Sequence, residues 1–156
     1  MTQMMKPQMK PPIKPPATAQ WLGYAGLLPF AGLALCAYFG GGEMAALARQ
    51  GLYLYGAMIL SFLGGLHWGR LSTPGQDFSA RWLIWSVLPS LWGWALIWWQ
   101  PAAPATGLGL AAALLICWAV DRYAIKAGLF VSWLAVLRRH LSLGASLSLL
   151  LGSFSF

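Results

Sequence analysis

The chain has 156 residues, of which 59% are hydrophobic and only 8% are charged. A typical soluble domain is about 25% charged and about 45–50% apolar, so a soluble fold of this length could not cover its surface with polar groups. The net charge of +7 raises the question of nucleic-acid binding. We expect none, because the Lys and Arg residues are scattered between apolar runs and form no basic face.

The first twenty residues, 1–20, combine three lysines with five prolines. Proline removes backbone hydrogen-bond donors and favours an extended polyproline conformation. We therefore expect residues 1–20 to form a flexible cytoplasmic tail that contributes nothing to a hydrophobic core.

Five apolar segments follow the tail, at residues 21–40, 51–69, 82–99, 104–120 and 141–156. The first four have 17 to 20 residues, and a helix of about 20 residues crosses about 30 Å of hydrocarbon. The fifth has only 16 residues, but Arg138 and Arg139 can lengthen it by reaching toward the headgroups. We predict an all-α polytopic integral membrane protein, with five transmembrane helices in one domain over residues 21–156 and the lipid bilayer as its immediate partner.

Residues 127–140, AGLFVSWLAVLRRH, are apolar and then basic, and are too short to cross a bilayer. This pattern predicts a short interfacial helix that leads into the fifth span. Two prolines, Pro29 and Pro89, lie in the middle of the first and third spans. Each frees a carbonyl one turn earlier in its helix and can kink that helix.

The first span also has to be distinguished from a signal peptide. Ala46-Leu47-Ala48 fits a cleavage site, but the apolar run that precedes it exceeds the usual 7–15 residues of a signal peptide. We expect the span to be retained.

The basic residues are concentrated in the tail and in every second gap between the spans. Nine of the ten occur in the tail and in the second-to-third and fourth-to-fifth gaps, and only Arg49 lies on the other side. Excess Lys and Arg mark the cytoplasmic side of a membrane protein. The pattern predicts that the N-terminus is inside and the C-terminus outside.

The second segment ends with SFLGGLHWGR, residues 61–70. Small residues recur there every four positions, at Ala57, Ser61, Gly65 and Gly69. Such a ridge allows two helix backbones to approach closely in lipid. We predict that this ridge makes a close helix–helix contact.

The same segment carries His67 and Arg70 near its inner end, and the fourth segment closes with Asp121 and Arg122. The second and fourth helices both run inward, so these four residues lie at one depth and form a candidate polar cluster at the inner face. A buried ionisable group in a membrane suggests a site and needs a partner, and for His67 we predict Asp121. An alternative is that the pair only fixes how the helices are aligned.

No other pattern indicates a site. The first helix runs outward and the fourth inward, which places Cys36 and Cys117 in opposite leaflets, too far apart for a disulfide. Among His67, Cys117, Asp121 and His140, no two have the spacing of metal ligands. We predict no metal, no cofactor and no catalytic residue.

Four stretches, LPFAGLA, YGAMILSFLGGLHWGRL, WSVLPSLWGWAL and WLAVLRRHLS, resemble a bacterial domain-of-unknown-function family of small membrane proteins that is related to animal mitochondrial transmembrane protein 69. The resemblance covers about residues 21–156 and is most specific around Leu63–Arg70. It implies an integral membrane protein of the bacterial inner membrane and supplies no catalytic residues.

Three functions remain open from the sequence. The first is a non-enzymatic membrane protein that packs against other helices, as a homo-oligomer or with another membrane protein. The second is a transporter or channel for a small solute or protons. The third is a membrane enzyme that uses His67 and Asp121 at the inner face.

Overall fold

The computed structural model describes residues 14–72, 80–99 and 102–154, and these residues form helices with no strand. The elements are α1 (Ala17–Ala25), α2 (Leu27–Phe39), α3 (Gly42–Leu71), α4 (Ala80–Trp99), α5 (Ala103–Lys126) and α6 (Leu134–Ser153). The expected all-α class is confirmed for the described residues. The predicted tail lies mostly outside them, and its last four residues belong instead to α1.

Helices α1 and α2 form one nearly continuous apolar unit of 23 residues, interrupted at Gly26. Pro29 explains the interruption, because proline has no N–H to donate to the carbonyl of Ala25, four residues earlier. The hydroxyl of Tyr55 on α3 donates to the carbonyl of Gly26 at 3.0 Å. A side chain from the next helix thus supplies a donor at the break. Pro89, by contrast, lies inside α4, which remains a single helix.

Three consecutive glycines, Gly40 to Gly42, join α2 to α3 in a tight turn. Gly42 has a φ of 53°, in the left-handed region that only glycine enters at little cost. The turn therefore reverses the chain within a few residues, and α3 packs back along α2.

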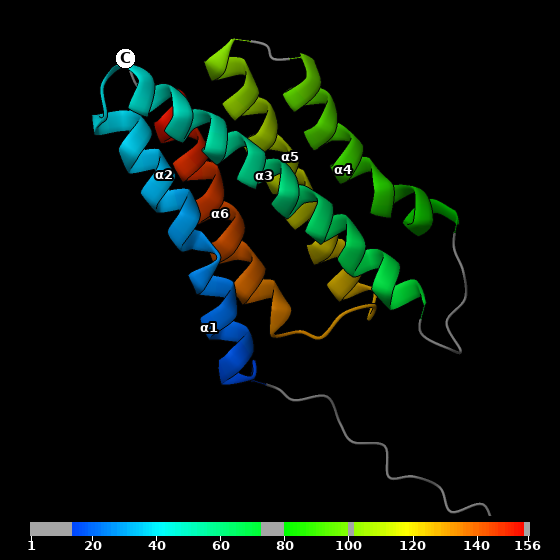
Figure 1. Ribbon diagram of the computed structural model, residues 1–156. Helices are drawn as coiled ribbons and strands as arrows, with labels where there is room; N and C mark the ends of the chain where they lie inside the picture. The colour runs from blue at the N-terminus through cyan, green and yellow to red at the C-terminus, as the bar shows by residue number, and fades with distance from the viewer. Residues whose placement is uncertain (1–13, 73–79, 100–101, 155–156) are drawn as a thin grey trace, which may run out of the picture.

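Helix α3 is the centre of the bundle, since it packs against α2, α4, α5 and α6. Consecutive helical units run in opposite directions, and α6 lies between α2 and α5 (Figure 1). The starts of α1, α4 and α6 and the ends of α3 and α5 are therefore at one end of the bundle. The end of α6 lies at the other end, beside the turn between α2 and α3.

Large apolar side chains fill the interior, and many others cover the outside. The fully buried ones are Phe30, Leu52, Leu60, Leu110, Leu114 and Leu149. Exposed apolar side chains occur on all six helices, including Trp98 and Trp99 of α4, which are 76% and 84% exposed. An apolar exterior around an apolar core is what a lipid environment requires.

Small residues bring the helices close together, but along a line different from the predicted ridge. A Cβ added to Gly64 would lie 2.2 Å from the carbonyl oxygen of Ser86, so α3 and α4 are in backbone contact there. A Cβ added to Gly65 or Gly69 would have no neighbouring atom within 4 Å outside its own stretch of helix, and Ser61 is exposed. Of the four ridge residues, Ala57 lies in close contact with Gly93 of α4. Within the chain, the close approach runs through Gly64 and Ala57, and the other ridge residues face outward.

Three helix boundaries also differ from the predicted segments. Helix α3 begins nine residues before the predicted second span, and α5 continues beyond Val120 to Lys126. No separate interfacial helix forms over residues 127–140, because α6 begins at Leu134 and runs without a break to Ser153. The prediction of an interfacial helix is wrong, since the basic residues at 138–140 fall inside a helix that buries Leu137 and Arg138.

Candidate functional site

The imidazole of His67 is buried between three helices near the C-terminal end of α3. Its Nε2 lies 2.8 Å from Oδ1 of Asp121 on α5. The ring of Trp82 from α4 stacks on the imidazole at 5.5 Å between centroids, and the ring of Phe130 meets it edge-on at 5.1 Å. The contact expected from the sequence between His67 and Asp121 is present, and aromatic rings hold the imidazole in place.

Asp121 is 2% exposed, and both of its carboxylate oxygens have partners. The Nε of Arg138 on α6 donates to Oδ2 at 2.6 Å, while His67 contacts Oδ1. One carboxylate therefore joins α3, α5 and α6 in a three-residue ionic cluster of His67, Asp121 and Arg138. Burying a lone carboxylate would cost several kcal/mol, and the two partners offset that cost.

The other two predicted cluster residues lie elsewhere. The Nε of Arg70 donates to the carbonyl of Leu129 at 2.6 Å, which ties the end of α3 to the connection between α5 and α6. Arg122 is exposed and places its guanidinium 5.3 Å from the ring centroid of Trp118. The structure thus brings together two of the four predicted residues and adds Arg138, which the sequence suggested only as a flanking charge.

A signal for Arg138 was available in the composition. The chain has only three acidic residues, and one of them, Asp121, directly follows the fourth apolar run and needs a cationic partner if it is buried. The gap between the fourth and fifth predicted spans contains several basic residues. Only the residue at which α6 begins decides that Arg138 is the one that reaches the carboxylate.

Other titratable side chains of the described residues pair outside this cluster. His140 lies on α6 with its Nδ1 2.9 Å from the hydroxyl of Tyr24, at an exposed position. In the part of the chain that the structure describes, no three His, Cys, Asp or Glu side chains are placed to hold a metal ion. No serine, threonine or cysteine side chain there forms a hydrogen bond with His67.

The described residues define a class of protein: a bundle of apolar helices, three of whose helical units are long and apolar enough to cross a membrane. A family model described as "Protein of unknown function (DUF3429)" matches residues 15–154, so the chain belongs to that family. The match spans all six helices and includes the ionic cluster. It confirms the expected domain-of-unknown-function family, while the relation to mitochondrial transmembrane protein 69 stays a prediction.

No curated protein matches the chain, and no solved structure matches it.

Proposed function

We propose that the chain is a non-enzymatic integral protein of the bacterial inner membrane, in which all five helical units cross the bilayer. The units α1–α2, α5 and α6 meet the length and hydropathy of a span by themselves. Helix α3 packs against α2, α5 and α6, so we infer that it crosses the bilayer together with them. Helix α4 packs against α3 and α5 and exposes Leu91, Trp94 and Trp98, which suits lipid better than water.

The charge distribution supports an orientation with the N-terminus in the cytoplasm. The described basic residues at the end where α1 starts are Lys14, Arg70, Arg81, Arg122, Lys126, Arg138 and Arg139. The opposite end has Arg49 and Glu43. The relation that we predict between this family and a mitochondrial membrane protein would suit a location in the bacterial inner membrane.

Reporter fusions test this topology. An alkaline phosphatase fused after Gly42 or Ala103 should be active, because both positions lie on the outer side. The same enzyme fused after Lys126 should be inactive, and a fluorescent protein fused there should fold and fluoresce. Activity of the phosphatase after Lys126 would refute the orientation.

The observation that carries the structural role is the ionic cluster. It connects three helices through one carboxylate, and its residues are 2–6% exposed. A reaction centre needs a nucleophile or a metal beside such a pair, and the described residues place neither next to His67 and Asp121. A structural role needs only the contacts that are present. The enzyme reading is therefore less well supported.

A transport function is less well supported for a different reason. A path for a solute or a proton needs polar groups through the middle of the bilayer. The middle of this bundle is filled by buried leucines, Leu52, Leu60, Leu110 and Leu114. The polar groups of the ionic cluster lie only toward the inner end.

We further propose that the bundle associates with a second copy or with another membrane protein through the outward-facing part of the ridge, Ser61, Gly65 and Gly69. Small residues on a lipid-facing surface permit close approach of another helix. Replacement of Gly65 by Leu should abolish association in mild detergent and leave the fold intact, since no atom lies within 4 Å of the added Cβ.

Gly32→Leu on α2 is the matched control for this test, because that glycine also has open space beside it. Light scattering after size-exclusion chromatography would measure the oligomer, and mass spectrometry would identify any co-purifying protein. Equal association of the wild type and both variants would show that the ridge is not an interface.

A further inference from the structure

A cavity of about 140 Å³ lies beside the ionic cluster, between α1, α2, α3, α5 and α6. Its walls are almost entirely apolar and include Leu27, Phe30, Leu63 and Leu114. A cavity of about 150 Å³ lined by leucine, isoleucine and phenylalanine is large enough to bind benzene. The space therefore fits one end of a small apolar molecule or of a chain.

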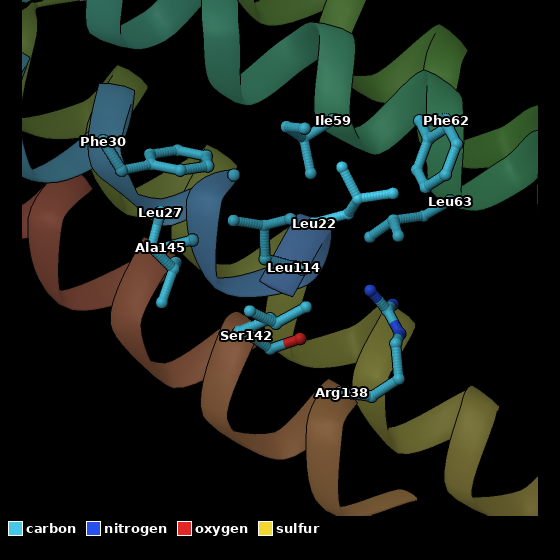
Figure 2. A pocket seen from close by; sticks show the side chains of 13 residues that line it. Leu22, Leu27, Phe30, Ile59, Phe62, Leu63, Leu114, Arg138, Ser142 and Ala145 are labelled. Carbon is cyan, nitrogen blue, oxygen red and sulfur yellow. The ribbon is translucent and has the colours of Figure 1, made fainter. Parts of the chain in front are cut away.

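Two polar atoms in the cavity wall make no hydrogen bond, although Arg138 as a whole is paired with Asp121 through its Nε. Arg138 and Ser142 are 6% and 2% exposed, and both line the cavity. The Nη2 of Arg138 lies close to Oδ2 of Asp121 but makes no hydrogen bond of normal geometry, and the hydroxyl of Ser142 has no hydrogen-bond partner. Figure 2 shows the guanidinium of Arg138 rising from α6 toward Leu63 and Leu22, with the hydroxyl of Ser142 in the same wall.

Buried polar groups without a hydrogen bond are rare in folded proteins, and leaving one unpaired destabilises the fold. A guanidinium N–H and a hydroxyl one helical turn apart are a matched pair of donors for one acceptor group. The other side chains in the cavity wall are apolar, so we expect the rest of the ligand to be apolar.

The surrounding charge selects the type of acceptor. At this end of the bundle the described residues include exposed Arg81, Arg122, Lys126 and Arg139, whereas Asp121 is already paired. A positive potential favours an anionic acceptor over a neutral one. The exposed side chains of Leu22 and Phe62 form the rim, so the cavity opens beside an apolar surface.

We propose that this cavity binds the carboxylate end of a fatty acid. The carboxylate accepts hydrogen bonds from Arg138 Nη2 and Ser142 Oγ, the first methylenes fill the cavity, and the rest of the chain leaves between Leu22 and Phe62. Entry from the bilayer rests on the membrane location proposed above. Binding to purified protein does not depend on the orientation of the spans, so the two proposals fail separately.

The test is equilibrium binding of radiolabelled dodecanoate to the full chain in phosphatidylcholine nanodiscs. Ser142→Ala should weaken binding about tenfold or more, since a hydrogen bond to a charged group is lost. The same variant should unfold at the same or a higher temperature without ligand, because it removes a hydroxyl that has no partner.

Ser146→Ala is the matched control, one turn further along α6. Its hydroxyl is equally buried but donates to the carbonyl of Ala111 at 3.3 Å and does not line the cavity. This variant should lose a little stability and bind dodecanoate like the wild type. Ser142→Leu, which fills the cavity, should abolish binding.

Two results would overturn the proposal. One is equal binding of dodecanoate to the wild type, Ser142→Ala and Ser142→Leu, since the cavity would then not be the site. The other is competition by methyl dodecanoate as strong as that by dodecanoate, since the site would then recognise a neutral carbonyl and not a carboxylate.

Discussion

Gly64 and Gly65 are neighbours on α3, and the same substitution to alanine should have opposite effects at the two positions. A Cβ at position 64 would lie 2.2 Å from the carbonyl oxygen of Ser86 and 3.2 Å from its carbonyl carbon. A Cβ at position 65 would have no atom within 4 Å. The two variants share the helix and the substitution, so their difference isolates the contact between α3 and α4.

The magnitude follows from that contact. Both substitutions gain about 1 kcal/mol of helix propensity, because alanine replaces glycine inside a helix. At position 64 the helices must also separate by about 1 Å to restore an ordinary van der Waals distance, and overpacking of this kind typically costs about 1–3 kcal/mol. The atom in the way is backbone of α4 and cannot rotate aside. We therefore expect Gly65→Ala to be slightly more stable than the wild type and Gly64→Ala to be less stable.

Thermal unfolding in one detergent, followed by fluorescence-detected size-exclusion chromatography, measures both variants. The expected order of midpoints is Gly65→Ala, wild type, Gly64→Ala. The assignment of the close helix contact to Gly64 would be refuted if the two variants had equal unfolding midpoints, or if Gly65→Ala had a lower midpoint than Gly64→Ala.

Three further substitutions test the polar contacts by the same unfolding measurement. Asp121→Asn should lower the free energy of unfolding by about 3–5 kcal/mol, because it leaves the buried guanidinium of Arg138 without its counter-charge. His67→Gln should lower it by only about 1 kcal/mol, because glutamine can still donate a hydrogen bond to Oδ1 of Asp121. Equal losses would mean that Arg138 is not the main partner of the carboxylate. Tyr55→Phe should cost about 1 kcal/mol, since it removes the donor to the Gly26 carbonyl but keeps the ring that packs at 4.8 Å against Phe30. No change in stability would show that the break between α1 and α2 needs no such donor.

The sequence by itself determined the class of protein and the approximate positions of its helices. Apolar runs of 16 to 20 residues predict helices of membrane-spanning length, and each predicted run overlaps a helical unit of the structure. The direction of successive helices also predicted that His67 and Asp121 share one depth. That argument needs only an alternating chain, and the two side chains are 2.8 Å apart.

Only the tertiary structure decided which faces of the helices meet. Successive residues on a helix point about 100° apart, so a ridge of small residues can be read at Gly65 while the contact runs through Gly64. In lipid-facing helices apolar residues cover all sides, and no hydrophobic stripe shows which line faces a neighbour. The pairing of Arg138 with Asp121 was likewise decided by the tertiary structure and not by the sequence pattern. A basic residue near the end of a span suggests an exposed flank, but α6 begins at Leu134, and this start places Arg138 within the bundle against Asp121.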